Sequence, residues 1–130
     1  MRFTQIKETC LYISDLDRTE EFYCNKLDFE LISKVQDRHT FFRVGSSVLL
    51  CFLPEITRVE KILPPHYAEG PQHIAFEVTK EDYSSIKSQI VKADIKICHV
   101  KEWKNGDLES FYFYDPDGHV LEVVPEGLWD

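Results

Sequence analysis

The sequence repeats one order of secondary structure, and this repeat limits the fold more than any other feature. Hydrophobic periods predict strand, helix, strand, strand, strand in residues 5–53, and the same order again in residues 72–125. Residues 54–71 show no period and contain Pro54, Pro64, Pro65 and Gly70, so we expect a linker there. The sequence therefore predicts a single α+β domain of two βαβββ modules, whose sheets form a cupped mixed sheet around a cavity.

Polar residues mark the expected start of each helix. Asp17 with Glu20, and Thr79 with Asp82, have the spacing of helix-capping pairs. The Asp-Pro-Asp-Gly sequence at 115–118 predicts a tight turn between the final two strands. The expected strands are Glu8–Ile13, Phe29–Val35, Thr40–Val44, Ser47–Leu53, Gln72–Val78, Ile95–Val100, Glu109–Tyr114 and His119–Val124.

Aligning the two modules brings four positions into correspondence. The strands before the two helices pair Glu8 with His73, and the closing strands pair Leu50 with Glu122. Glu122 is a carboxylate within an otherwise apolar strand, and burying it without a partner would be costly. Two carboxylates and an imidazole suit a divalent ion such as Mn²⁺, Fe²⁺, Ni²⁺ or Zn²⁺ and leave open positions for substrate.

Each of these three residues also has a purely structural interpretation. Glu122 can be a buried acid bonded to a lysine or a turn amide, and His73 can donate to a backbone carbonyl. Glu8, beside Lys7, can be a solvated strand residue.

The net charge limits the binding partners to be expected, and the cysteines indicate the cellular compartment. The chain has 15 basic and 23 acidic side chains, a net charge of −8, which argues against nucleic acid or an anionic membrane as the partner. No apolar run is long enough to span a bilayer. The acidic charge instead favours a small-molecule substrate or another protein as the partner. The four cysteines form no Cys-x-x-Cys pair, so we expect free thiols and a cytoplasmic location.

Several segments resemble the vicinal oxygen chelate superfamily. They are the stretch from Ser110 to Glu122, the strand that opens with Gln72 and His73, and the opening residues 11–16 followed by Glu21, Phe22 and Tyr23. That superfamily includes glyoxalase I, bleomycin-resistance proteins, extradiol dioxygenases and fosfomycin-resistance thiol transferases. The resemblance covers nearly the whole chain and implies a homodimer whose pockets are completed across the subunit interface.

The resemblance also implies roles for individual residues. Glu8, His73 and Glu122 match the metal-ligand positions, with Glu122 as the catalytic ligand. Leu50 stands where glyoxalase I has a further glutamate, and this three-ligand pattern is more similar to the fosfomycin-resistance transferases. The substrate contacts implied are Lys104, Tyr112, Cys10 and Leu50.

Two functions follow as expectations. The first is a divalent-metal-dependent lyase, isomerase or thiol transferase acting on a small oxygen-rich electrophile. The second is a dimer of the bleomycin-resistance type that binds and sequesters a small aromatic ligand without catalysis.

Overall fold

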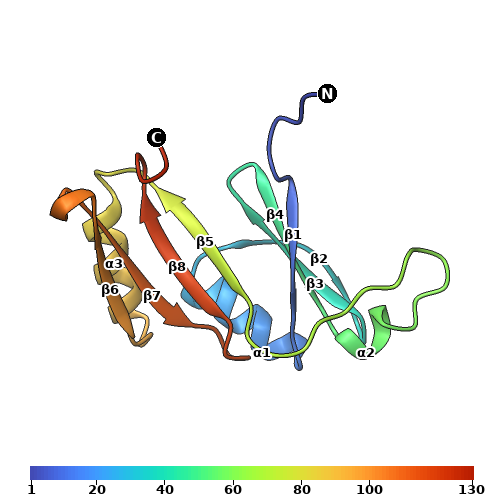
Figure 1. The fold of residues 1–130 in the computed structure, drawn as a ribbon. Coiled ribbons are helices and arrows are strands. Elements are labelled where there is room, and N and C mark those ends of the chain that lie inside the picture. The colour runs from blue at the N-terminus through green and yellow to red at the C-terminus, as the bar shows by residue number, and fades with distance from the viewer. The chain divides into compact units, whose positions relative to one another are not determined.

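The computed structural model describes all of residues 1–130, which form two compact units, Met1–Gly70 and Pro71–Asp130 (Figure 1). Each unit contains one four-stranded sheet, with strand orders β1-β4-β3-β2 and β5-β8-β7-β6. In both sheets the first and last strands of the unit pair in parallel, and all other pairs are antiparallel. The matching orders confirm the predicted α+β fold with two βαβββ modules.

The elements of the first unit are β1 (Glu8–Tyr12), α1 (Leu16–Glu20), the π-helix η1 (Glu21–Lys26), β2 (Glu30–Val35), β3 (His39–Val44), β4 (Ser47–Phe52) and α2 (Pro54–Thr57). The elements of the second are β5 (His73–Val78), α3 (Tyr83–Lys92), β6 (His99–Trp103), the 3₁₀ turn η2 (Lys104–Gly106), β7 (Leu108–Tyr114) and β8 (Val120–Pro125).

The first helix begins after a different cap from the one expected. Asp15 has an extended backbone, and its carboxylate accepts a hydrogen bond of 2.8 Å from the backbone N–H of Arg18. The predicted cap at Asp17 is therefore wrong: Asp17 lies in the first turn, where a negative charge still favours the helix dipole. The helix continues into η1, where Tyr23 is fully buried with its ring centroid 5.2 Å from that of Phe42.

In the second unit, α3 covers one face of the sheet (Figure 1). The Tyr83 ring lies 5.6 Å from the Phe111 ring, and Lys87 donates a 2.6 Å hydrogen bond to Glu109. Phe111, Phe113 and Leu121 on this face are almost completely buried. Since side chains alternate along a strand, the neighbours of these residues lie on the opposite face, away from α3.

One strand lies four residues later than the sequence indicates. The prediction of a strand at Ile95–Val100 is wrong for its first half, because β6 spans His99–Trp103. Ile95 is buried and its N–H bonds to the carbonyl of Ile90, so it belongs to the end of the helix rather than to the sheet. Ile95 is apolar because it packs into the core just after the helix ends, and this apolar residue led to the wrong strand prediction.

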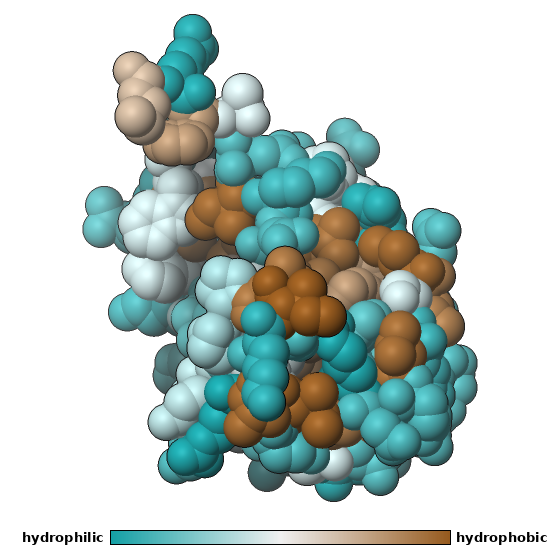
Figure 2. Space-filling view, turned by 90° about the vertical axis from the view of Figure 1, so that its right-hand side faces the viewer, coloured by the Kyte–Doolittle hydropathy of each residue, from teal (hydrophilic) through white to brown (hydrophobic).

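The linker is partly ordered by local bonds and exposes apolar side chains. Pro54 opens the short helix α2, and the N–H of His66 bonds to the carbonyl of Thr57 at 3.1 Å. Val59, Ile62 and Leu63 are exposed, and hydrophobic atoms reach the surface on the side of the molecule that carries this segment (Figure 2). None of the helices has the length and apolar character needed to cross a lipid bilayer.

Candidate metal and substrate site

A histidine and a glutamate meet on the face of the second sheet that α3 leaves uncovered. His73 opens β5 and Glu122 lies in β8, the parallel neighbour of β5. The Nε2 atom of His73 is 3.3 Å from Oε2 of Glu122, and the Glu122 side chain is only 8% exposed. The predicted ligands His73 and Glu122 are therefore brought together.

The ring of His73 is held in one orientation by its other nitrogen. Nδ1 lies 2.8 Å from the carbonyl oxygen of Val120, and since a carbonyl only accepts, Nδ1 must carry the hydrogen. In the neutral ring Nε2 then presents a lone pair to the Glu122 carboxylate. Two such electron-rich atoms need a proton or a metal cation between them.

Glu122 also has an unused oxygen. Its Oε1 atom is buried and has no hydrogen-bond partner. Leaving a buried carboxylate oxygen unsatisfied is expensive, and coordination of a cation would remove that cost. A backbone-bonded histidine beside a buried carboxylate is also a usual arrangement of metal ligands, so the residues present fit a divalent ion.

Tyr112 lies beside this pair, directly opposite Glu122 in the β7–β8 register. Its ring centroid is 6.1 Å from that of His73. Burial raises the pKa of Tyr112, and hydrogen bonding to Glu122 raises it further, against the opposing effect of a hydrogen bond with Ser110. Tyr112 is therefore a neutral hydroxyl at physiological pH, and its hydrogen is donated to the Glu122 carboxylate.

The remaining predicted residues of the first unit share one face of its sheet. Glu8 opens β1 and is exposed, and Cys10 lies opposite Leu50 in the β1–β4 register. Ala75 lies opposite Glu122 in the same way, so Leu50 and Glu122 occupy equivalent positions in the two units. Burial, followed by the negative charge of Glu8, raises the pKa of the Cys10 thiol, so this thiol is protonated near neutral pH.

Neither unit by itself gathers three or more His, Cys, Asp or Glu side chains into a metal site. The second unit supplies two of the three predicted ligands, His73 and Glu122, and the third, Glu8, belongs to the first unit.

Lys104 occupies a different place from the other predicted substrate contacts. It lies in η2, after the end of β6. Its ammonium group donates to the backbone carbonyls of Gly127 and Asp130. A substrate bound by Lys104 would have to replace these bonds.

The structure places further residues near Tyr112 that the sequence did not single out. The ring of His99 lies 5.7 Å from that of Tyr112, its direct partner in the β6–β7 register. The strand predicted at Ile95–Val100 ended before Lys101, so the alternation of β6 beyond His99 was not visible. The segment from His99 to Trp103 has the adjacent charged residues Lys101 and Glu102, which interrupt the polar–apolar alternation by which a strand is predicted.

The first unit also contains an aromatic cluster on the same face as Cys10 and Leu50. The rings of His39 and Phe41 stack at 3.8 Å, and Phe52 lies edge-on to Phe41 at 5.2 Å. His66 of the linker packs 5.0 Å from Phe52 and shares a 2.5 Å hydrogen bond with the hydroxyl of Tyr12. His66 belongs to residues 54–71, for which the sequence predicts only a linker.

Comparison with known proteins agrees with this fold. The family model described as "Glyoxalase/Bleomycin resistance protein/Dioxygenase superfamily" matches residues 5–123. The metallothiol transferase FosB of Lysinibacillus sphaericus is 27% identical over all of this chain and 88% of its own length. The glutathione transferase FosA of Serratia marcescens is 30% identical over 87% of this chain and 74% of its own. A crystal structure of lactoylglutathione lyase from Agrobacterium tumefaciens has a TM-score of 0.92 and 32% identity, covering 99% of this chain and 98% of the other.

Proposed function

The chain belongs to the glyoxalase/bleomycin resistance protein/dioxygenase superfamily, and on that premise we propose that it is a divalent-metal-dependent enzyme acting on a small, oxygen-rich electrophile. The proposed ligands are Glu8, His73 and Glu122, and the ion is Mn²⁺, Fe²⁺, Ni²⁺ or Zn²⁺. Relatives named as a metallothiol transferase, a glutathione transferase and a lactoylglutathione lyase support this class of activity.

One observation carries the proposal: His73, whose Nδ1 is bound to the Val120 carbonyl, places Nε2 3.3 Å from Glu122, whose second oxygen is buried and has no hydrogen-bond partner. A buried acid with a purely structural role would have both of its oxygens satisfied by donors. The arrangement is therefore better suited to a cation than to the purely structural role.

A divalent ion held there would act as a Lewis acid toward a carbonyl or toward two neighbouring oxygens of the substrate. Residues of the protein orient the two ligand side chains and contact the substrate. Val120 fixes the His73 ring, and the burial of Glu122 keeps water away from its carboxylate. Tyr112, which donates to Glu122, is proposed to contact the substrate next to that carboxylate.

The position equivalent to Glu122 in the first unit favours one reaction type. It holds Leu50, which has no group able to accept a proton. A reaction that moves a proton between neighbouring carbons needs such a base. We therefore favour transfer of a thiol to the bound electrophile, with Cys10 and Leu50 as apolar contacts and Lys104 as a further substrate contact.

The proposed assembly rests on the family, and the proposed location rests on the cysteines. Membership of the superfamily supports our proposal of a homodimer that completes its pockets across the subunit interface. All four cysteines are free, which supports a reducing, cytoplasmic compartment.

Metal analysis tests the proposal directly. We expect the protein purified without chelator to bind one equivalent of divalent metal per chain, and Glu122→Gln or His73→Ala to weaken metal affinity by more than roughly 100-fold, since even outer residues contribute 10–100-fold. Glu102→Gln, an exposed carboxylate on β6, is the matched control and should bind like the wild type. Absence of metal, or equal metal in all variants, would exclude the proposed centre.

The aromatic cluster supports sequestration of a planar ligand as the second candidate function. Stacked rings on the face that carries Leu50 are suited to a flat aromatic molecule. Titration with 2-naphthol in the presence of Mn²⁺ and again with EDTA separates the two functions. Sequestration predicts the same affinity in both, and binding at a metal centre predicts loss of affinity with EDTA.

A further inference from the structure

The outer strand of the second sheet presents three side chains beside the carboxylate–imidazole pair. His99 lies opposite Tyr112 and Lys101 lies opposite Ser110 in the β6–β7 register. Residues directly opposite in a sheet share a face, so His99, Lys101 and Trp103 lie on the same face as Tyr112 and Glu122. We refer to His99 and Lys101 together as the β6 strip.

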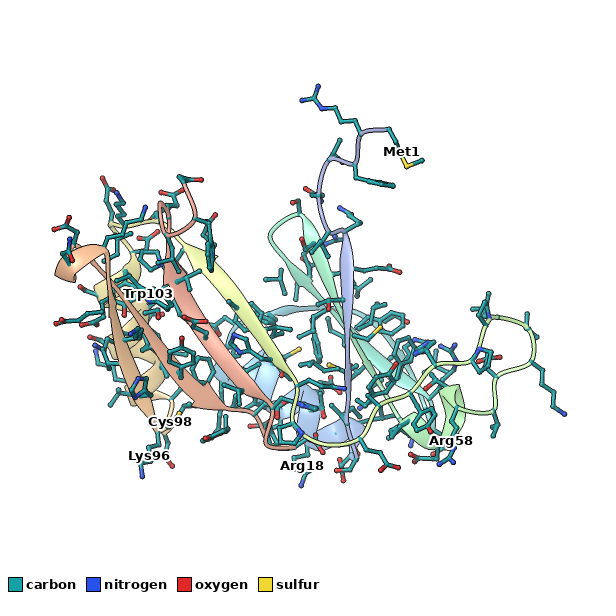
Figure 3. The ribbon with its side chains drawn as sticks, in the orientation of Figure 1. Met1, Arg18, Arg58, Lys96, Cys98 and Trp103 are labelled. Carbon is teal, nitrogen blue, oxygen red and sulfur yellow. The ribbon has the colours of Figure 1, made fainter.

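Trp103 is held in place beside this strip by a hydrogen bond. Its indole N–H donates a 2.9 Å hydrogen bond to Oγ of Ser110, a fully buried residue of β7. The ammonium of Lys101 lies 5.4 Å from the centre of the Trp103 ring. Figure 3 labels Trp103 at one end of β6 and Cys98 just before the other. The aromatic face orients Lys101 without neutralising its charge.

No carboxylate of the structure forms an ion pair with Lys101. Its neighbour in sequence, Glu102, points to the opposite face because side chains alternate. Glu109 is also on that face and is bonded to Lys87 and Tyr83. Lys101 is therefore an uncompensated cation next to Tyr112, whereas the ammonium of Lys104 is used by carbonyls of Gly127 and Asp130.

We infer that the β6 strip, which lies beside Tyr112, binds an anionic group of the substrate, such as a carboxylate or phosphate. This inference rests on the proposed function and adds the substrate class: a molecule with chelating oxygens at one end and a negative charge at the other. Adjacent strands are about 4.8 Å apart, so β6 lies roughly 10 Å from β8, and the flexible Lys101 side chain shortens that span. Both ends of a small molecule can be held at once.

The test uses methyl phosphate as the anionic probe and the full-length protein. Binding is followed by the shifts of backbone amide signals in NMR spectra, with and without Zn²⁺. We expect Lys101→Gln to weaken methyl phosphate binding by about tenfold, the value of one charge-assisted hydrogen bond. His99→Gln should weaken it by a smaller factor, and the wild-type shifts should centre on β6 and β7.

Two further variants distinguish this inference from its alternatives. Lys96→Gln removes an exposed lysine before β6 and should bind methyl phosphate like the wild type. Weakening in Lys104→Gln but not in Lys101→Gln would overturn the inference and assign the anion to Lys104. Absence of methyl phosphate binding to the wild type, with or without Zn²⁺, would also overturn it.

The outcome is separable from that of the proposed function. If Zn²⁺ binds and Lys101→Gln leaves methyl phosphate affinity unchanged, the anion site fails and the metal centre stands. If no metal binds but Lys101→Gln still weakens methyl phosphate binding about tenfold, the metal centre fails and the anion site stands.

Discussion

At the scale of single residues, the surroundings of a side chain decide its protonation. Glu122 is kept among apolar strand neighbours, yet only one of its oxygens has a polar partner. His39 in the first unit differs from Glu122, because both of its ring nitrogens have hydrogen-bond partners. Nδ1 lies 2.6 Å from the Arg38 guanidinium, which can only donate, and Nε2 lies 3.1 Å from Oγ of Ser33. His39 is therefore held in its neutral form.

His39 predicts a loss of stability in mild acid. Burial, followed by the charge of Arg38, lowers its pKa below the ordinary 6.5, so below about pH 6.5 the unfolded chain binds a proton that the folded chain excludes. Stability therefore falls as pH decreases through that range. We expect His39→Gln to lose less stability than the wild type between pH 7.5 and pH 5.5, measured by urea unfolding. An equal loss in both proteins would contradict this assignment.

At the scale of elements, the start of α1 depends on a single capping carboxylate. Asp15 supplies the bond to the N–H of Arg18, so Asp15→Ala should lower the free energy of unfolding by about 1 kcal/mol. Asp17→Ala should cost less, because the exposed ion pair of Asp17 with Lys34 leaves Lys34 still bound to Glu20. Urea unfolding of the two variants compares them, and the reverse order would restore Asp17 as the cap.

The elements also show what the sequence can and cannot predict. Alternation and turn residues predicted the order of all eight strands, and aligning the modules placed Leu50 and Glu122 at equivalent positions, as the strand registers confirm. The start of β6 was not predictable, because Ile95 is an apolar residue that packs at the end of the helix. In the sequence such a residue cannot be distinguished from a buried strand residue. The β6 strip was missed for that reason. Pairing of His73 with Glu122 was predicted, but the bond that orients His73 goes to a backbone carbonyl, which leaves no trace in a sequence.

At the scale of the whole molecule, the proposed metal ligands come from both units. A ligand that binds only the folded state stabilises it, by about 2.7 kcal/mol at a concentration 100 times its Kd. We expect Mn²⁺ to raise the melting temperature of the wild type and to raise that of Glu8→Gln much less. Calorimetry with and without EDTA measures both shifts. A full shift in Glu8→Gln would show that the first unit contributes no ligand.

The parallel pairing of first and last strands in each unit has a consequence for how the protein folds. β1 can pair only after β4 has formed, and β5 only after β8. The contact between His73 of β5 and Val120 of β8 spans 47 residues of chain. Contacts of such long range form late and slow the folding rate. Glu122 lies on the closing strand of its unit, so its buried carboxylate leaves water only when the rest of that sheet is already in place. The surface that carries the proposed metal ligands is therefore completed late in folding, when few competing partners for that carboxylate remain exposed.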